Sequence, residues 1–120
     1  LDEGLHLPFM NGKVVFTHAV RSMSQSLLDT VKAAEVDLGD VDLFLFHQAN
    51  MRINSKVAEL LGVSEKKVFN TIQKYGNTTA ATIPLGMYDA IEEGALKPGM
   101  LVGLATFGSG FTWSSALLRF

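Results

Sequence analysis

The 120-residue sequence is 48% hydrophobic and 18% charged, a composition typical of one compact domain. A formal net charge of −2 gives no general case for nucleic-acid binding, and no apolar run approaches the ~20 residues of a membrane-spanning helix. Cysteine is absent, which excludes disulfides, thiolate metal sites and a cysteine nucleophile from these residues. The three histidines lack ligand spacing, so we expect no metal site.

Residues 1–8 do not resemble a signal peptide, because no basic region precedes an apolar stretch there. The chain begins with Leu rather than Met, so we expect it to be a fragment or a processed product. We expect residues 1–9 to form an N-terminal extension and residues 10–120 to form a single domain, since no linker or internal repeat interrupts them.

The first half of the chain predicts strands alternating with helices. Residues 13–16 are a short apolar run after a turn signal and predict a strand. Apolar residues then recur at steps of three and four over residues 20–34, which predicts an amphipathic helix. Residues 43–46 form a continuous apolar run, typical of a strand buried on both faces. Residues 53–61 predict a second helix, which Gly62 ends.

The second half of the chain predicts three more strands and a helix. Residues 68–72 predict a third strand, and a helix follows from residue 82. Residues 78–82 are small and uncharged, which indicates that the start of this helix packs between two layers. Residues 100–107 and 111–120 predict strands, antiparallel because only a short Gly turn joins them.

The resulting order, β-α-β-α-β-α-β-β, predicts an α/β domain with a five-stranded mixed sheet and three main helices. In open α/β sheets, ligands gather at the carboxyl ends of the strands. Three polar or Gly-containing segments follow expected strands there: residues 47–50, 75–78 and 107–110.

Each of these segments has a simpler explanation when taken alone. A single His at a strand end is more often structural, and Asn77 beside Gly76 is typical of a turn or helix cap. Residues 108–110 precede a strand rather than a helix, so a dinucleotide site is excluded by its context. Arg52 and Lys56 lie one helical turn apart, which a solvated face explains.

Taken together, the segments resemble one known family, the β-ketoacyl-acyl-carrier-protein synthase III family. Residues 46–53, Phe-His-Gln-Ala-Asn-Met-Arg-Ile, resemble its His-Gln-Ala-Asn-x-Arg-Ile motif. Residues 75–84, Tyr-Gly-Asn-Thr-Thr-Ala-Ala-Thr-Ile-Pro, resemble its Gly-Asn-Thr-x-Ala-Ala-x-x-Pro motif. Residues 107–113, Phe-Gly-Ser-Gly-Phe-Thr-Trp, resemble its Gly-rich turn and closing strand. The resemblance runs from about residue 10 to residue 120.

The resemblance implies that the chain is the C-terminal half of a thiolase-like condensing enzyme. Such an enzyme joins acyl-CoA to malonyl-ACP (acyl carrier protein) by decarboxylative Claisen condensation, at the start of fatty-acid synthesis in the cytoplasm. It needs no cofactor. The nucleophilic Cys belongs to the N-terminal half, so we expect the 120 residues alone to be inactive. The implied partners are acyl carrier protein, CoA thioesters, the Cys-bearing half and a second copy of the chain.

The same resemblance implies roles for individual residues. His47 and Asn77 match the family's catalytic donors, because an imidazole N–H and an amide N–H can together hold the enolate formed on decarboxylation. Ser109 stands where the family often has Gly, which keeps the backbone N–H of the oxyanion hole but adds a side chain. The remaining positions match the acyl pocket at Phe107, the CoA or pantetheine tunnel at Asn50, Gly12 and Phe16, and a carrier-docking patch at Arg52 and Lys56.

Two other interpretations stay open on the sequence alone. The chain could be a non-catalytic module that docks a carrier protein or another subunit. It could also belong to a related acyltransferase or polyketide starter condensing enzyme with the same fold. Retention of both His47 and Asn77 favours catalysis, because packing alone does not require that pair.

Overall fold

A computed structural model describes residues 11–120. The expected extension at residues 1–9, and residue 10 at the start of the expected domain, lie outside the described residues. Four α-helices and three strands follow in the order α1 (Gly12–Ala33), β1 (Leu43–Phe46), α2 (Met51–Leu61), α3 (Ile72–Tyr75), α4 (Thr82–Glu92), β2 (Leu101–Gly108) and β3 (Thr112–Arg119). Short 3-10 turns lie at Leu38–Asp40, Glu65–Lys67 and Thr79–Ala81.

The three strands form one mixed sheet in the order β1-β2-β3. β1 pairs with β2 in parallel, with Phe46 opposite Ala105, and β2 pairs with β3 as an antiparallel hairpin. Because parallel strands point the same way, the carboxyl ends of β1 and β2 meet at one edge of the sheet. The predicted strand at residues 43–46 and the antiparallel final pair are confirmed.

Two of the five predicted strands are wrong. Residues 13–16 lie at the start of α1, which begins at Gly12. Its N-cap is Asn11, whose side chain accepts a hydrogen bond from Val14 N at 3.2 Å. The apolar run therefore belongs to the helical period that continues through residues 20–34. Residues 68–72 make only a single parallel bridge, Phe44 to Val68, before the chain turns into α3.

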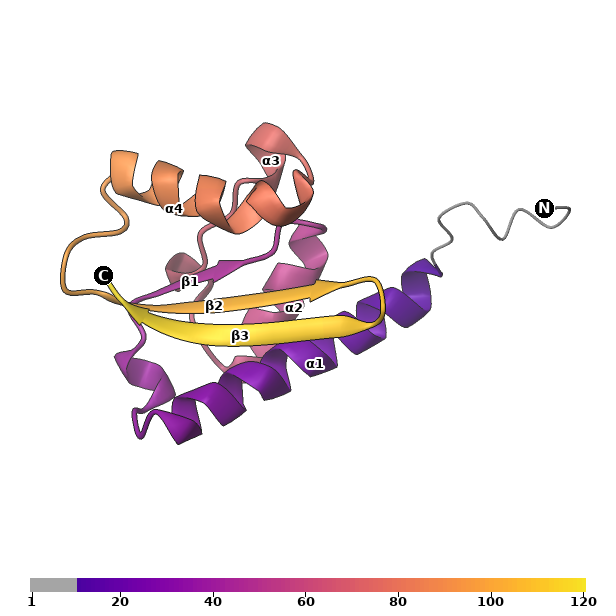
Figure 1. The fold of residues 1–120 in the computed structure, drawn as a ribbon, viewed down its shortest axis with the longest axis horizontal. Helices are drawn as coiled ribbons and strands as arrows, with labels where there is room; N and C mark the ends of the chain where they lie inside the picture. Colours follow the sequence, from indigo (N-terminus) through magenta and orange to yellow (C-terminus); the bar gives the residue numbers. More distant parts are fainter. Residues whose placement is uncertain (1–10) are drawn as a thin grey trace, which may run out of the picture.

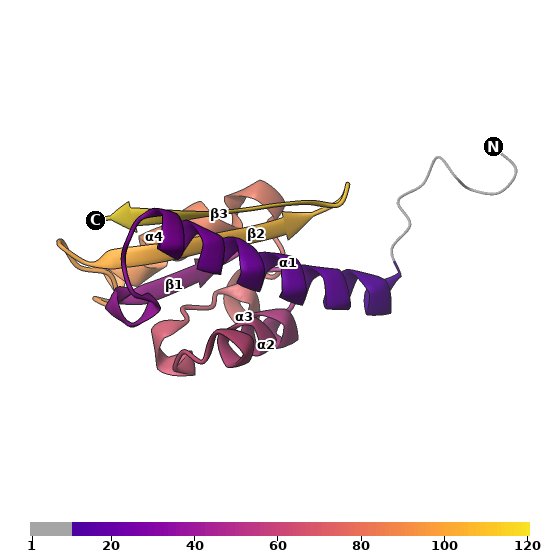
Figure 2. The same ribbon diagram turned by 90° about the horizontal axis from the view of Figure 1, so that it is seen from below.

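The sheet is covered by α1 and α2 on one face and by α4 on the other (Figure 1, Figure 2). Phe44 and Phe46 of β1 pack into the core under α1 and α2, whereas Leu43 and Leu45 pack into the core under α4. Side chains alternate between the faces of a strand, so a strand covered on both faces needs an apolar residue at every position. This explains the unbroken apolar run.

α4 is packed on one side only within the described residues. Its buried positions include Thr82, Gly86 and Ala90, and a Cβ at Gly86 would lie 3.5 Å from Leu45 Cδ2. Its opposite side exposes Tyr88 and Ile91 at 61% and 42%. The chain thus provides one of the two layers expected around this helix. Among residues 11–120, no helix combines the length and apolarity needed to cross a membrane.

Gly103 in the central strand is closely packed, and a larger residue there should destabilise the fold. A Cβ at Gly103 would lie 3.0 Å from Phe44 Cδ1 and 3.4 Å from Val41 Cγ1. We predict that Gly103→Val lowers the free energy of unfolding by about 1–3 kcal/mol, as overpacked cores do. Urea denaturation at fixed protein concentration measures this. Gly39→Val is the control, since a Cβ at Gly39 meets nothing within 4 Å. Equal losses in the two variants would contradict the assignment.

The uncovered side of α4 should make the isolated 120 residues self-associate. Exposed apolar side chains at Tyr88 and Ile91 form part of this side, and contiguous apolar surface drives association. We predict oligomers by sedimentation velocity at micromolar concentration, and a shift toward monomer in the double variant Tyr88→Lys, Ile91→Lys. A monodisperse monomer of the unaltered chain would show the expectation to be wrong.

Candidate functional site

A pocket of about 1130 Å³ lies at the carboxyl ends of β1 and β2, where the first turns of α1 and α2 also meet. Of the nine residues assigned roles from the sequence, eight line this pocket: Gly12, Phe16, His47, Asn50, Arg52, Asn77, Phe107 and Ser109. The ninth, Lys56, does not. Within residues 11–120, no three His, Cys, Asp or Glu side chains gather in a way that could hold a metal ion.

Strand pairing and helix capping place the His47–Asn50 segment. The backbone N–H of His47 donates to Ala105 O at 2.9 Å, which extends the β1–β2 ladder by one residue and holds His47 at the sheet edge. The chain then enters α2, whose N-cap is Asn50; its Oδ1 accepts from Arg52 N at 2.9 Å. This cap satisfies one of the N–H groups that a helix start leaves without a partner.

His47 is held at its ring as well as at its backbone. Nδ1 lies 2.7 Å from the hydroxyl of Thr82, a residue that is only 3% exposed in the first turn of α4. Burial lowers the pKa of the His47 imidazole below its usual value of 6.5, since the charged form loses hydration. A neutral imidazole that accepts from Thr82 at Nδ1 carries its proton on Nε2, which leaves Nε2 as a donor.

Thr82 is a site residue that the sequence reasoning missed. The sequence around it predicts only a helix start. Its contact with His47 joins positions 35 residues apart, across the sheet edge. No local pattern signals such a contact. The nearest clue was the uncharged character of residues 78–82, which indicated burial but no partner.

Asn77 is oriented by its own neighbours. It follows α3 and Gly76, whose φ of +69° lies in the region that favours glycine. Its Oδ1 accepts from Thr79 N at 2.8 Å, so the acceptor is occupied and the two Nδ2 hydrogens are left as donors. Thr79 itself has a φ of +54°, uncommon for a β-branched residue. Backbone strain of this kind clusters at functional sites.

Aromatic side chains form one wall of the pocket. Phe107, at the end of β2, is only 8% exposed, and its ring centroid lies 5.0 Å from that of Phe111. It also lies 6.3 Å from Trp113 at an interplanar angle of 14°, in a stacked arrangement. Phe111 in turn lies 5.2 Å from the ring of His18 on α1. The pocket therefore has an apolar side next to the polar side that carries His47.

The turn between β2 and β3 carries Ser109 at the pocket edge. Ser109 is exposed, and its carbonyl accepts from the hydroxyl of Thr112 at 3.1 Å. Gly110 has a φ of +146°, and a Cβ there would lie 2.8 Å from Thr112 Cγ2. Glycine is thus required at position 110, whereas position 109 has room for a side chain.

The two basic residues assigned to carrier docking have different surroundings. The Arg52 guanidinium lies 5.7 Å from the ring centroid of Phe16, close enough for a cation–π contact across the pocket mouth. Lys56 lies one turn further along α2 and forms an ion pair with Glu59 at 3.0 Å, with 44% of its side chain exposed. Arg52 is therefore part of the pocket, and Lys56 is part of the outer face of the helix.

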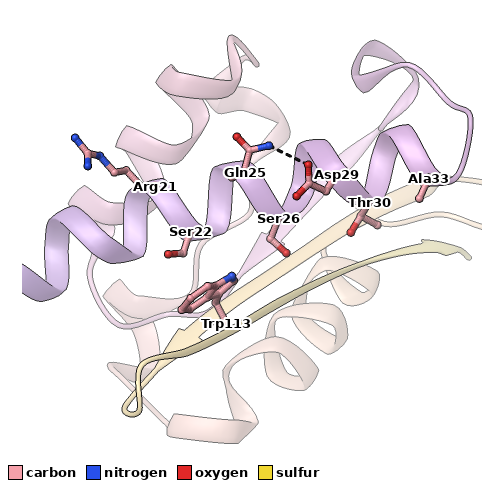
Figure 3. A pocket seen from close by; sticks show the side chains of 8 residues that line it. All are labelled: Arg21, Ser22, Gln25, Ser26, Asp29, Thr30, Ala33 and Trp113. Atoms are coloured by element: carbon pink, nitrogen blue, oxygen red, sulfur yellow. Dashed lines mark hydrogen bonds between the residues drawn. The ribbon is translucent and has the colours of Figure 1, made fainter.

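A second hollow of about 590 Å³ lies between α1 and β3 (Figure 3). No residue assigned a role from the sequence lines it. Four of its polar side chains are bonded to one another or to β3: Gln25 donates to Asp29 at 2.9 Å, and the hydroxyls of Ser26 and Thr30 lie 2.6 and 2.7 Å from that of Ser115. We therefore take the larger pocket as the candidate site.

Comparison with known proteins agrees with the motif resemblance. The sequence profile of the family described as "3-Oxoacyl-[acyl-carrier-protein (ACP)] synthase III C terminal" matches residues 31–120. A β-ketoacyl-[acyl-carrier-protein] synthase III of Nitratidesulfovibrio vulgaris is 50% identical over 111 residues. The match covers 92% of this chain and 34% of that relative, so the chain spans about a third of the relative's length.

Solved structures show the same fold. The 3-oxoacyl-[acyl-carrier-protein] synthase III of Aquifex aeolicus matches with a TM-score of 0.91 at 44% identity, over 93% of this chain and 36% of that one. The β-ketoacyl-[acyl-carrier-protein] synthase III of Thermus thermophilus matches with a TM-score of 0.90 at 39% identity, over 93% and 35%. The expected α/β architecture of one part of a thiolase-like fold is confirmed, with three strands in place of five.

The lowered pKa of His47 predicts a specific pH dependence. The folded chain should keep the imidazole neutral around pH 6.5, where an unfolded His already takes up a proton. The contribution of this group to stability is therefore present above about 6.5 and is lost as pH falls toward the folded pKa. An NMR titration of His47 Cε1–H, assigned with His47→Asn, measures the midpoint. A midpoint above 6.5 would contradict the effect of burial.

Proposed function

The chain belongs to the family of 3-oxoacyl-[acyl-carrier-protein] synthase III C-terminal domains, and we propose that it supplies two donors for a decarboxylative condensation of acyl-CoA with malonyl-ACP. One observation carries this proposal. His47 and Asn77 line the same pocket, and each has its other polar atom already occupied, Nδ1 by Thr82 and Oδ1 by Thr79 N. With Thr82 as the donor to Nδ1, both side chains can present an N–H group to one ligand oxygen.

Those two donors suit the charge that decarboxylation creates. When the malonyl thioester loses CO₂, the electron pair of the broken C–C bond moves into an enolate, with negative charge on the thioester oxygen. Neutral donors that are already in position stabilise this oxygen without reorganisation. The carbanion carbon then attacks the acyl thioester carbon. A new C–C bond forms, the thiolate of the Cys leaves, and the product is a β-ketoacyl thioester.

The Cys that carries the acyl group has to come from outside these residues, since the chain contains none. We propose that a Cys-bearing half completes the site and covers the exposed side of α4, a helix that begins directly after the pocket residues Thr79 and Ala80 and the intervening Ala81. On this proposal the 120 residues alone do not condense substrates. The completed enzyme acts in the cytoplasm, without a cofactor, and associates with a second copy of itself.

The remaining pocket residues fit supporting roles. We propose that Phe107 borders the acyl chain, that the backbone N–H of Ser109 contributes to an oxyanion hole, and that Gly12, Phe16 and Asn50 lie along the pantetheine arm. Arg52 then faces the acidic carrier protein, and Lys56 extends the same basic surface. Attraction of this kind acts mainly on the association rate and weakens with salt.

A non-catalytic role in docking a carrier protein is the second candidate. The position of Arg52 at the pocket mouth is compatible with it. A docking module does not, however, account for the lowered pKa of His47 or for the contact that orients its ring. A related acyltransferase or polyketide starter enzyme would use the same donors with another acyl group.

Alanine substitutions at the two donors separate these candidates. In the natural polypeptide that contains these residues, we predict that His47→Ala and Asn77→Ala each lower the condensation rate by about 10²–10³-fold, the usual loss for an oxyanion donor. Transfer of the acyl group from acyl-CoA to the protein should persist. The assay follows malonyl-ACP turnover and protein acylation separately.

Gln25→Ala, in the second hollow, is the matched control and should leave both steps unchanged. If His47→Ala and Asn77→Ala keep condensation at the rate of the unaltered protein, the catalytic proposal fails. If they lose only carrier binding, the docking module is the correct function.

A further inference from the structure

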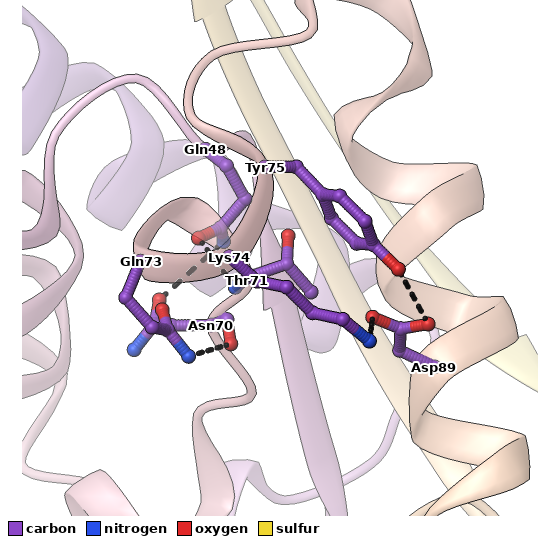
Figure 4. A network of polar contacts seen from close by, with 7 residues as sticks. All are labelled: Gln48, Asn70, Thr71, Gln73, Lys74, Tyr75 and Asp89. Atoms are coloured by element: carbon purple, nitrogen blue, oxygen red, sulfur yellow. Dashed lines mark hydrogen bonds and ion pairs between the residues drawn. The ribbon is translucent and has the colours of Figure 1, made fainter.

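We propose that Gln48, which no part of the reaction above uses, is the positioning residue that sets where Asn77 lies relative to His47. The inference rests on the proposed function, because it concerns the two donors of that reaction. It is carried by a group of polar contacts around α3, which Figure 4 shows.

Gln48 is buried, only 2% exposed, yet its amide makes four hydrogen bonds. Oε1 accepts from Thr71 N at 3.0 Å and from Ile72 N at 3.1 Å. Nε2 donates to Phe46 O at 2.8 Å and, more weakly, to Asn70 Oδ1 at 3.4 Å. A buried amide with this many partners is costly to replace, because each lost partner is left without water to bind.

The two hydrogen bonds that Gln48 Oε1 accepts determine where α3 begins. α3 spans Ile72–Tyr75, a single turn, and helices this short are not stable by themselves. Its N-cap residue, Thr71, makes no capping bond with its own side chain. The N–H groups of Thr71 and Ile72 are instead capped by Gln48, which lies 23 and 24 residues earlier in the chain. The place where α3 begins therefore depends on Gln48.

The far end of α3 is held by α4. The hydroxyl of Tyr75 donates to Asp89 Oδ1 at 3.1 Å, and Lys74 Nζ lies 3.2 Å from Asp89 Oδ2 (Figure 4). Asp89 is 4% exposed, so its carboxylate is fixed among these partners. The next residues are Gly76 and Asn77. α3 is thus held at its start by Gln48 and at its end by Asp89, and Asn77 follows it after one residue.

A second amide supports Gln48 from α2. Asn54, which is fully buried, donates from Nδ2 to Asn70 Oδ1 at 2.8 Å. That same oxygen accepts the long bond from Gln48. Asn70 therefore joins the two side chains just before α3. The network couples the start of α3 to both β1 and α2.

Gln48 and His47 are consecutive residues whose side chains lie in different places. His47 lines the pocket and bonds to Thr82, while Gln48 is buried beneath α3. His47 is thus bonded directly to Gln48, whose side chain holds the start of α3, and Asn77 follows α3 in the chain. Displacement of one donor by about 1 Å can reduce a rate about 100-fold, because the donors must meet one oxygen together. Loss of the Gln48 contacts should therefore separate the donors without removing either.

The test uses the natural polypeptide with Gln48→Met, which has a side chain of similar length and no amide. We expect the condensation kcat to fall about 10–100-fold, with the KM for malonyl-ACP and the rate of protein acylation nearly unchanged. Hydrogen exchange of the Thr71 and Ile72 amides should become faster. A purely structural role would instead lower all activities in proportion to the folded fraction.

Val31→Ala is the matched control, a buried position in α1 that does not line the pocket. It should lower stability while leaving kcat per folded molecule unchanged. Gln48→Glu is the second variant, because a protonated Glu offers one acceptor and one O–H donor in place of the amide. Its kcat relative to the unaltered protein should rise as pH falls.

A folded Gln48→Met protein with unaltered kcat and unaltered exchange of both amides overturns the inference. So does a Gln48→Glu protein whose relative kcat is independent of pH, if Gln48→Met does not fold. If the unaltered polypeptide itself gives no condensation, the proposed function fails. Amide exchange in Gln48→Met then still decides whether Gln48 holds α3.

Discussion

The parallel pairing of β1 with β2 brings the candidate site together. This pairing sets His47 one residue past the end of β1, where its N–H still bonds to Ala105 O. It also brings Phe107, near the end of β2, to the same edge of the sheet. Because β1 is buried on both faces, its register is strongly specified: a slip of one residue would exchange the side chains beneath α1 and α4. The position of the imidazole therefore follows from core packing.

Two buried polar contacts then decide how the donors are presented. Thr82 holds the ring of His47 from α4, and Gln48 caps α3 from the end of β1. Buried polar groups are unfavourable unless their hydrogen bonds are satisfied, and here nearly all are. Among the described residues, Asn54 Oδ1 is the one buried side-chain atom without a partner, and it lies in the same network. Buried polar groups lower the stability of the fold relative to apolar ones, but their hydrogen bonds define one geometry.

One side of α4 has no packing partner among residues 11–120, so these residues do not enclose the site completely. α4 packs on the sheet through Gly86 and Ala90, but its other side is exposed. The chain spans about a third of the length of its relative from Nitratidesulfovibrio vulgaris. The pocket lining reaches Thr79 and Ala80, just before α4 in the chain. Donors stabilise an enolate best where water is excluded. A covering layer would therefore change the chemistry of the pocket as well as its shape.

The sequence by itself determined the parts of this protein that depend on local pattern. The buried strand at residues 43–46, the end of α2 at Gly62 and the final hairpin follow from periodicity and turn residues over a few positions. Eight of the nine residues that the motif resemblance assigned to the site line one pocket, while their individual roles stay predictions. Each motif is a short segment, so its residues could be recognised without knowledge of the fold.

Only the tertiary structure decided the number of strands and the contacts that orient the donors. Residues 13–16 have strand-like composition, yet the cap at Asn11 and the core under α1 make them helical, because packing outweighs local propensity. Residues 68–72 have one strand partner and turn into α3, whose first N–H groups bond to Gln48. The bonds of Thr82 and Gln48 join residues 35 and 23–24 positions apart. No local pattern encodes such pairs, since they exist only once the sheet has brought its strand ends together.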